Sequence, residues 1–326
     1  MSDPAISVLL PIYNAQATLG AAIGSLLAQS YRDFEIVAVD DGSSDGTPDL
    51  LADYAAADGR VRVITTANRG LVAALNTAIE AARGGLGARM DADDICEPER
   101  FTRQVAHLGT HDECVVVGCQ VTLIDEAGVP HRKQPSLGGS FRMKDRCGGF
   151  TKFPPSPPTV PHPTAMIRME ALRRAGGYRH FFANGAEDRD LWWRLMSLGE
   201  AHRIPERLLR YRVHAKNRSS TLRAGAVADA LVSDFSAIAR HFGLVDLTIL
   251  EDYRADRFSL TADRYARLVG ERYPVEALAQ YRAITRKLPE LLDWSGTAEM
   301  RRDALRHLLR RPMSAASWRV VWAAVT

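Results

Sequence analysis

The chain of 326 residues is long enough for one large domain with an appendage, or for two domains. Its hydrophobic share of 46% and charged share of 25% are those of an ordinary soluble globular protein, and no segment approaches the roughly 18 apolar residues that span a bilayer. A net charge of +3 is too small to indicate a nucleic-acid partner, although residues 300–326 are rich in arginine.

The cysteines and the N-terminus bear on the cellular compartment. The four cysteines form no CxxC pair and no zinc-type spacing with histidine, which fits free thiols in a reducing compartment. The first apolar run, residues 6–12, follows no basic region and is too short for the core of a signal peptide. We therefore expect a cytoplasmic protein.

Apolar strands alternate with amphipathic helices in the N-terminal part of the chain. We expect strands at residues 6–13, 34–39, 61–64 and 86–90, a strand pair or bent strand at 115–124, and helices that follow the first four strands. Thr18 and Thr47 are the expected N-caps, with Pro48 at the first helical position. This order predicts a doubly wound, mostly parallel α/β sheet with helices on both faces. Since no GxGxxG or GxxxxGK[ST] motif follows the first strand, ordinary Rossmann and P-loop proteins are disfavoured.

The pattern changes in the second half of the chain. Residues 130–163 are rich in glycine and proline and carry no core pattern, so we expect a long irregular connection with a functional role. Order returns at residues 164–174, and from about residue 224 onward the pattern is helical only. The soft boundary near Leu222 predicts an α/β domain over residues 1–222 and an all-helical C-terminal region over residues 223–326.

Two apolar runs end abruptly in carboxylates, which are Asp40 and Asp41 after the first run and Asp91, Asp93 and Asp94 after the second. In an open α/β sheet, ligands bind at the carboxyl ends of the strands, so both clusters should meet at one site. Three carboxylates in four residues repel one another unless a cation or a basic side chain neutralises them. Such oxygen ligands suit Mg²⁺ or Mn²⁺ with substrate phosphates, which favours an enzyme that handles a nucleotide diphosphate. The alternative is that each cluster is an ordinary Asp-rich turn or helix cap.

Taken in order, these motifs resemble those of the family 2 glycosyltransferases, which have the GT-A fold. The matching segments are residues 7–14, 39–45, 68–71 with 74–76, 90–94, 163–168, 176–178, 186–194 and 211–214. The resemblance covers roughly residues 5–221 and does not reach the helical C-terminus. It implies a catalytic domain with nucleotide-sugar binding in residues 1–125 and the acceptor side in residues 126–222.

The resemblance assigns a donor site position by position. Pro11, Tyr13, Asn14 and Asp41 would hold the nucleotide base and ribose. The Tyr13 ring can stack on a base and Asp41 can accept from a uracil N3–H, so a UDP-sugar is the favoured donor. Arg69 would pair with a phosphate or the base through its guanidinium. The alternatives are that Tyr13 packs the first loop and that Arg69 is an exposed surface residue.

The Asp-x-Asp element of the family falls at Asp91 and Asp93, where it would bridge the ribose and the metal-bound diphosphate. Asp93 is the expected ligand of Mn²⁺ or Mg²⁺ and Asp91 the expected contact to the ribose or a bound water, although Asp94 could replace either. His214 lies in a Tyr-Arg-x-His element and either adds an imidazole ligand or is structural. The metal would neutralise charge on the leaving diphosphate.

Asp188 corresponds to the family's acceptor-activating base, with Glu187 as the second choice. Such a base must lie within hydrogen-bond reach of the acceptor hydroxyl. The alternative is that both acids only stabilise the start of a helix. The implied enzyme is a metal-dependent, inverting hexosyl- or hexosaminyl-transferase of bacterial polysaccharide synthesis, which uses a nucleoside diphosphate sugar and a glycan or lipid-linked glycan acceptor.

Two other classes of protein compete with this interpretation. Sugar nucleotidyltransferases carry a Gly-rich basic element after the first strand, which residues 11–16 lack. A non-catalytic GT-A-like glycan- or partner-binding protein is disfavoured because Asp91, Asp93 and Asp188 are all present.

The C-terminal region has a feature of its own. Arginine alternates with leucine and tryptophan in residues 305–311 and 318–322. This pattern predicts either peripheral contact with the inner face of the cell membrane or packing onto the catalytic domain or across a homodimer.

Overall fold

The computed structural model describes residues 3–132, 160–180, 186–214 and 233. Contacts divide the chain into two units, the first comprising residues 1–142, 158–183 and 194–220 and the second residues 143–157, 184–193 and 221–326. Most of the predicted connection over residues 130–163 and nearly all of the predicted helical region lie outside the described residues, so the domain boundary near Leu222 stays a prediction.

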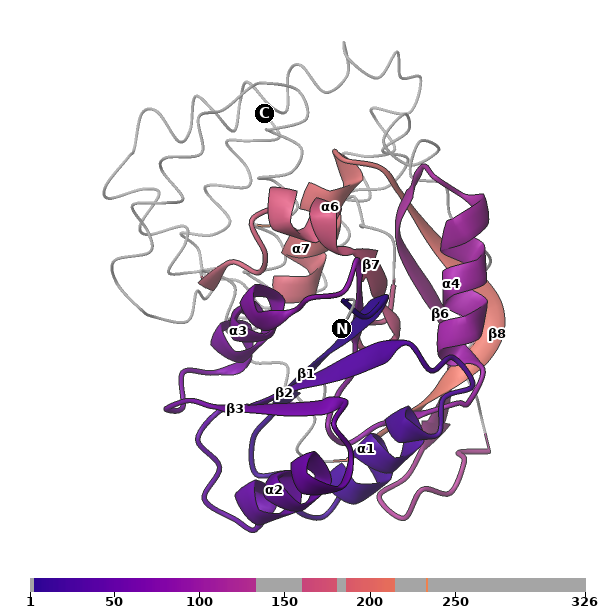
Figure 1. Cartoon of the computed structure of the whole chain (residues 1–326). Helices are drawn as coiled ribbons and strands as arrows, with labels where there is room; N and C mark the ends of the chain where they lie inside the picture. The colour runs from indigo at the N-terminus through magenta and orange to yellow at the C-terminus, as the bar shows by residue number, and fades with distance from the viewer. Residues whose placement is uncertain (1–2, 133–159, 181–185, 215–232, 234–326) are drawn as a thin grey trace, which may run out of the picture. The chain divides into compact units, whose positions relative to one another are not determined.

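The first unit is built on a mixed sheet of eight strands in the order β3-β2-β1-β4-β7-β6-β8-β5 (Figure 1). The strands are β1 (Ile6–Ile12), β2 (Phe34–Asp40), β3 (Val61–Thr65), β4 (Leu86–Arg89), β5 (Ile95–Cys96), β6 (Cys114–Ile124), β7 (Met166–Arg168) and β8 (Glu200–Arg212). The pairs β1–β2, β1–β4, β2–β3 and β6–β8 are parallel, whereas β7 runs antiparallel to both β4 and β6. The predicted doubly wound, mostly parallel α/β sheet is confirmed.

Helices cover both faces of the strands β1 to β3. The helices are α1 (Leu19–Leu27), α2 (Thr47–Ala57), α3 (Leu71–Ala81), α4 (Arg100–Thr110), α6 (Met169–Arg174), α7 (Glu187–Met196) and the 3₁₀ turn η1 (His162–Thr164). α1 and α2 lie on one side of β1 to β3 and α3 on the other (Figure 1). Every residue of β1 and β2 is buried, as expected for central parallel strands covered on both faces. No helix in this part of the chain is long and apolar enough to cross a bilayer.

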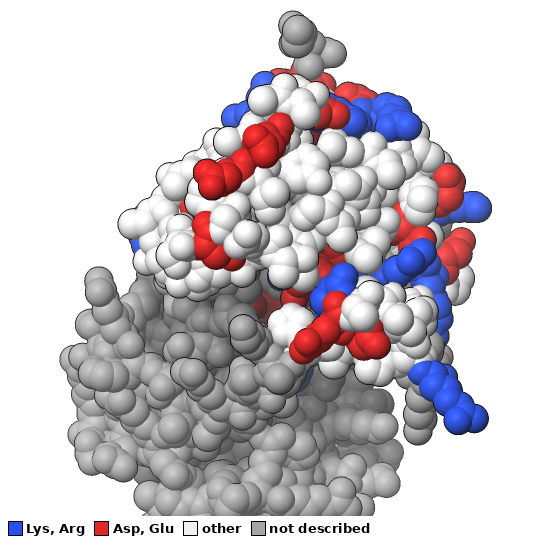
Figure 2. All heavy atoms as spheres, turned by 90° about the horizontal axis from the view of Figure 1, so that it is seen from below, with Lys and Arg blue, Asp and Glu red and all other residues white. Residues whose placement is uncertain are grey.

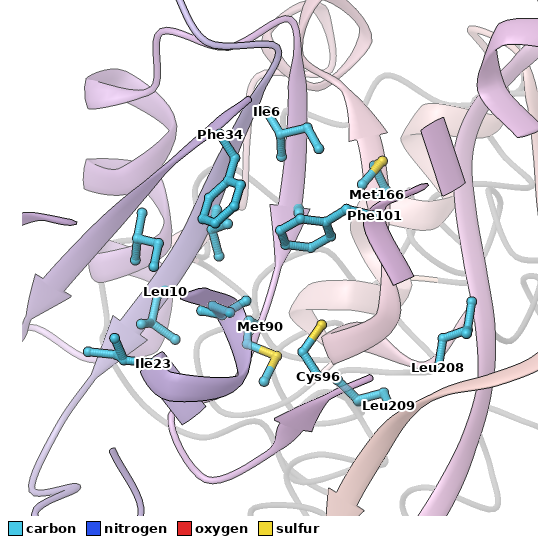
Figure 3. Close-up of a cluster of buried hydrophobic side chains, with 14 of the residues drawn as sticks. Ile6, Leu10, Ile23, Phe34, Met90, Cys96, Phe101, Met166, Leu208 and Leu209 are labelled. Atoms are coloured by element: carbon cyan, nitrogen blue, oxygen red, sulfur yellow. The ribbon is translucent and has the colours of Figure 1, made fainter. Parts of the chain in front are cut away.

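The hydrophobic core lies between the sheet and the helices α1, α2 and α4 (Figure 3). Phe34 on β2 and Phe101 on α4 meet edge to face with ring centroids 5.5 Å apart. Met90 is fully buried in this core and is the last residue before the carboxylate cluster. The chain therefore passes from core to polar edge within one residue, which fixes where the carboxylates begin.

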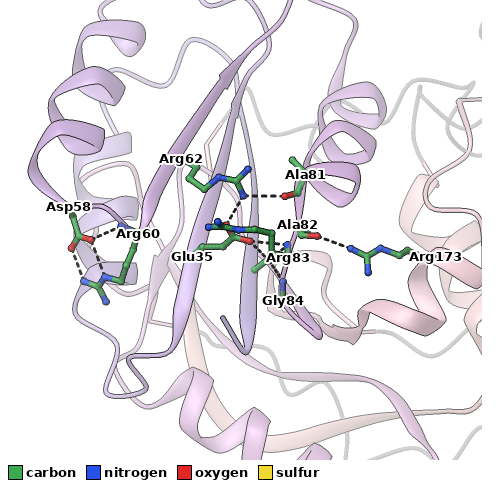
Figure 4. A network of polar contacts seen from close by, with 10 residues as sticks. Glu35, Asp58, Arg60, Arg62, Ala81, Ala82, Arg83, Gly84 and Arg173 are labelled. Carbon is green, nitrogen blue, oxygen red and sulfur yellow. Dashed lines mark hydrogen bonds and ion pairs between the residues drawn. The ribbon is translucent and has the colours of Figure 1, made fainter. Parts of the chain in front are cut away.

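A buried carboxylate links neighbouring strands at the edge of the sheet opposite the carboxylate cluster (Figure 4). Glu35 on β2 is 2% exposed and accepts hydrogen bonds from Ser7 on β1 at 2.7 Å and from Arg62 on β3 at 2.6 Å. Its carboxylate also accepts from the backbone N–H and the guanidinium of Arg83, which follows α3. One side chain thus joins three strands to the connection that enters β4.

Thr18 occupies the predicted N-cap position of α1 but without a side-chain cap bond, and the predicted N-cap at Thr47 is wrong because Gly46 takes that position. The hydroxyl of Thr18 makes no cap bond and instead donates to the backbone oxygen of Ala92 at 2.9 Å. α2 begins at Thr47 itself, and its backbone N–H donates to the carboxylate of Asp45. The Thr47 hydroxyl accepts from the N–H of Ala15 at 2.8 Å. Both hydroxyls therefore fix the loop after β1 rather than cap a helix.

The segment predicted as a strand pair or bent strand is the single strand β6. Its register against β8 shifts on either side of Gln120, so the strand is bent. One irregular strand accounts for both apolar runs in the sequence.

Acidic and basic side chains are interspersed on the face of the molecule drawn in Figure 2. Among the described residues on this face, neither sign covers a continuous area.

Candidate active site

Three carboxylates gather directly after β4. One oxygen from each of Asp91, Asp93 and Asp94 lies within 4.8 Å of the others. The side chains of Asp91 and Asp93 are 28% and 31% exposed, whereas Asp94 is buried. The cluster therefore has one buried and two accessible members, and the fold brings it together as the sequence predicted.

The accessible carboxylates each have a basic partner. Arg89, the buried last residue of β4, forms an ion pair with Asp91. The Nε2 atom of His214 lies 2.9 Å from a carboxylate oxygen of Asp93, although the two residues are 121 positions apart. The structure thus places the predicted His214 at the cluster. Arg89 was not predicted to have a role, although it lies at the end of the same apolar run.

Asp94 has one oxygen with a partner and one without. Its Oδ1 accepts from the backbone N–H of Arg212 at 2.9 Å, whereas its buried Oδ2 has no hydrogen-bond partner among the residues that the structure describes. Burial raises the pKa of Asp94 well above its usual value, and the nearby charges of Asp91 and Asp93 raise it further. A buried acceptor of this kind requires a partner, and a cation would provide one.

Arg212 holds the backbone around the cluster. Its guanidinium donates to the backbone oxygens of Asp93 at 2.8 Å, Asp125 at 3.0 Å and Glu126 at 2.7 Å. The last residue of β8 thereby joins the loop after β4 to the end of β6. Arg212 lies in the Tyr-Arg-x-His element, but no role was predicted for it. Its position at a strand end, two residues before His214, was the available signal.

The second acidic cluster lies at the same edge of the sheet, because β2 and β4 both flank β1 in parallel. Two strand spacings separate β2 from β4, which is about 10 Å. Asp41 is 4% exposed and accepts from the backbone N–H groups of Arg69 at 2.9 Å and Gly70 at 2.7 Å. Both clusters therefore follow parallel strands at the same edge of the sheet, and their meeting at one ligand site stays a prediction. The Arg69 side chain is exposed.

The loop after β1 presents the other predicted donor residues. Pro11 is buried within β1, whereas Tyr13 is 54% exposed, so its ring is accessible rather than packed in the first loop. Asn14 has a left-handed φ of 48°. Its N–H donates to the hydroxyl of Ser43 at 2.9 Å, and its side-chain oxygen accepts from the N–H of Ser44 at 2.8 Å. Asn14 therefore joins the loops that follow β1 and β2.

The two candidate bases lie in the first turn of α7, in the second unit. Glu187 is 7% exposed, whereas Asp188 is half-buried. A carboxylate oxygen of Asp188 accepts from the N–H of Arg189 at 2.7 Å. Ala186, directly before the helix, has a φ of 68°, a left-handed conformation that is uncommon for alanine. The predicted start of this helix is confirmed, and the role of either acid stays a prediction.

Residues 7–176 match the model of glycosyl transferase family 2. The chain belongs to this family. This family 2 glycosyltransferase is 36% identical over 228 residues to EpsE of Bacillus subtilis (strain 168), which carries the name of a glycosyltransferase; the match covers 68% of this chain and 78% of EpsE. It is 33% identical over 215 residues to the amylovoran biosynthesis glycosyltransferase AmsE of Erwinia amylovora, covering 63% of this chain and 75% of AmsE.

Solved structures share the fold of this family 2 glycosyltransferase. S. aureus TarS 1–349 in complex with UDP-GlcNAc has a TM-score of 0.64 and 17% identity, covering 100% of this chain and 90% of that chain. The mannosyltransferase PcManGT from Pyrobaculum calidifontis, in complex with GDP-Man and Mn²⁺, has a TM-score of 0.52 and 18% identity, covering 100% of this chain and 86% of that chain. The expected GT-A fold and the expected glycosyltransferase activity are both confirmed.

Proposed function

We propose that this glycosyltransferase moves a hexosyl or hexosaminyl group, with inversion and with the help of a divalent metal ion, from a nucleoside diphosphate sugar to a hydroxyl of a growing bacterial glycan. The observation that carries the proposal is the buried, unpartnered Oδ2 of Asp94 among three clustered carboxylates. The nucleotide sugars bound to TarS and PcManGT support the donor class. The name of AmsE, with amylovoran biosynthesis, supports the glycan acceptor.

The residues around the carboxylate cluster fit a divalent metal ion. Asp93 and His214 face each other and are partly exposed, so they are the ligands that an ion entering with the diphosphate would reach first. Asp94 would offer its buried Oδ2 to the ion, while Asp91, already paired with Arg89, would contact the ribose or a bound water. When bound, Mn²⁺ or Mg²⁺ would neutralise charge on the leaving diphosphate.

Asp41 and Tyr13 support a uracil nucleotide. Oδ1 of Asp41 accepts from the N–H of Arg69 and from the hydroxyl of Thr66, whereas Oδ2 accepts from the N–H of Gly70 and has room for a second donor. These bonds fix the carboxylate in place, so that it can accept from a uracil N3–H without reorganising. The exposed Tyr13 ring is available to stack on the base.

Asp188 is our candidate for the catalytic base. It would accept the proton of the acceptor hydroxyl, whose oxygen then attacks the anomeric carbon opposite the departing diphosphate and inverts it. Glu187 is in the same turn but only 7% exposed, so an acceptor sugar can approach Asp188 more easily.

The test is donor turnover in the purified protein. Incubation with Mn²⁺ and a panel of UDP-, GDP- and dTDP-sugars should release nucleoside diphosphate with one donor class, faster when acceptor extract is added. Asp93→Ala should abolish this release and the metal-dependent part of nucleotide binding while the fold stays intact, because the side chain is partly exposed.

The control is Asp53→Ala, which removes an exposed carboxylate on α2. It should behave as wild type. Full activity of Asp93→Ala in EDTA-treated buffer would contradict the metal assignment. Retention of anomeric configuration in the product would contradict inversion, and failure to turn over any nucleotide sugar would contradict the proposal as a whole.

A further inference from the structure

A second group of metal-binding side chains lies at the opposite edge of the sheet from the carboxylates. β6 and β4 both run antiparallel to β7, so they point the same way, and Cys114, the first residue of β6, lies at the amino edge. His107 comes from the last turn of α4, and Glu200 and His202 come from the start of β8. The proposed transfer reaction uses none of them.

These side chains contact one another directly. The Nε2 atom of His107 lies 2.8 Å from Nδ1 of His202, and Nε2 of His202 lies 3.1 Å from a carboxylate oxygen of Glu200. One donor atom each from His107, Cys114 and His202 lies within 4.8 Å of the others. Cys114 and His202 are buried, whereas His107 is half-buried, so solvent reaches the group from the α4 side.

The surrounding backbone holds this group in place. The guanidinium of Arg168 on β7 donates to the backbone oxygens of Cys114 at 2.8 Å, Leu108 at 2.8 Å and His111 at 3.2 Å. The His111 ring stacks on His107 with centroids 4.1 Å apart. The end of α4 and the start of β6 are therefore fixed to each other before any ligand binds.

We infer that His107, Cys114 and His202 form a binding site for a zinc-class transition-metal ion, which joins the end of α4 to the amino ends of β6 and β8. Two imidazole nitrogens and a thiolate suit Zn²⁺, with a water as the fourth ligand. The sequence showed no zinc-type spacing because the ligands come from two segments separated by residues 115–201.

The hydrogen bonds already select the correct nitrogen of His202. Glu200 accepts from Nε2–H, which leaves the lone pair on Nδ1, and a carboxylate behind a ligating histidine is the usual arrangement at metal sites. In the metal-free protein His107 donates its Nε2–H to that lone pair. Two nitrogens on a tetrahedral Zn²⁺ lie about 3.3 Å apart, so the 2.8 Å contact must open by about 0.5 Å.

Proton balance gives the site a pH dependence. Burial, with the neighbouring His111 and His202, lowers the pKa of His107, so its ring is neutral near pH 7. Its remaining proton moves from Nε2 to Nδ1 when the ion binds. Burial raises the pKa of Cys114 to about 12, so the thiol is protonated without metal and releases one proton to solvent on binding. Glu113 and Glu200 are the acids whose carboxylate oxygens lie near His202.

The test uses metal-stripped full-length protein titrated with Co²⁺ and, in competition, Zn²⁺. We expect an ultraviolet cobalt–thiolate charge-transfer band at one equivalent, which the carboxylate cluster cannot produce because it has no sulfur. Cys114→Ser should remove the band, and Glu200→Gln should weaken Zn²⁺ binding by about 10–100-fold. Cys119→Ser, which changes another buried thiol of β6, should keep both the cobalt–thiolate band and the affinity for Zn²⁺.

Several outcomes would overturn the site. These are no band in the wild-type protein, a band that persists in Cys114→Ser, or Zn²⁺ binding that is lost in Glu113→Gln but kept in Cys114→Ser. The last result would indicate an ion between Glu113, Glu200 and His202, whose donor atoms also lie within 4.8 Å of one another. If Cys114→Ser does not fold, the same titration is made on His107→Asn, whose position is half-buried. Loss of the cobalt–thiolate band in this variant supports the site, and retention of the band overturns it.

Discussion

Gly42 allows the chain to turn back directly after Asp41. Its φ is 74°, and a Cβ atom there would lie 2.8 Å from the backbone nitrogen of Asn68 and 3.2 Å from the oxygen of Thr66. The same 66–70 segment supplies the N–H groups that hold the Asp41 carboxylate. The glycine is therefore required twice, for its backbone conformation and for the close approach of the segment that orients Asp41.

Gly42→Ala should destabilise the protein by more than the roughly 1–2 kcal/mol that a left-handed alanine costs, because the added methyl group also meets fixed backbone. It should also weaken nucleotide binding by displacing the N–H donors to Asp41. The matched control is Gly70→Ala, where φ is 87° but no atom lies within 4 Å of the added Cβ. Chemical denaturation and nucleotide titration measure both effects. Equal losses in the two variants would show that strain alone matters.

At the residue scale, the sequence predicted the functional side chains that belong to a local motif. It missed those that act through contacts with residues far away in the sequence. Asp91, Asp93 and Asp94 could be found because they are adjacent at the end of one apolar run. The contact of His214 with Asp93 could be predicted only as an alternative, because it joins positions 121 residues apart. Arg212 binds backbone oxygens, which no residue type in the sequence marks, so only its position beside His214 hinted at a role.

At the scale of elements, strands were easier to predict than helix starts. Buried parallel strands form continuous apolar runs, whereas a helix cap depends on where one side-chain oxygen points. Thr18 and Thr47 have the right residue type for a cap but find partners in other loops. Glu35 went unnoticed because one acid in a buried strand acquires meaning only when Arg62 and Arg83 are brought beside it.

Glu35 makes the packing of β1 to β3 sensitive to pH. Burial alone would raise the pKa of Glu35, but hydrogen bonds from Arg83, Ser7 and Arg62 outweigh it and lower the pKa from 4.5 to about 2. A pKa lowered by folding adds stability above the unfolded value, and that stability is lost as the pH falls from about 4.5 toward 2. The contribution is at most about 3 kcal/mol, and less because both arginines are partly exposed.

Glu35→Gln should therefore lower the free energy of unfolding at pH 7 by up to about 3 kcal/mol and flatten its dependence on pH below 4.5. Urea denaturation at several pH values measures both. Asp58→Asn is the control, since the Asp58–Arg60 pair in Figure 4 is partly exposed and should contribute about 1 kcal/mol or less. A wild-type pH profile in Glu35→Gln would contradict the role of the network.

At the scale of the whole molecule, the candidate carboxylates fall in separate units of the chain. Asp93 belongs to the first unit and Asp188 to the second. Family resemblance predicted both from local motifs. No local motif states how two units combine, so a division of labour between the carboxylates has to be tested by function rather than read from the sequence.

Asp188→Asn keeps the shape of the side chain and its ability to accept from the N–H of Arg189, but it cannot take a proton. The rate of transfer should fall by roughly 10²–10⁴-fold, with donor affinity unchanged. Asp93→Ala should instead lose metal-dependent donor binding. Glu187→Gln is the control, because it removes a charge from the same helical turn. If the acids only stabilise the helix, both neutral variants should lose about 0.3–1 kcal/mol of stability and keep the full rate, which would rule out Asp188 as the base.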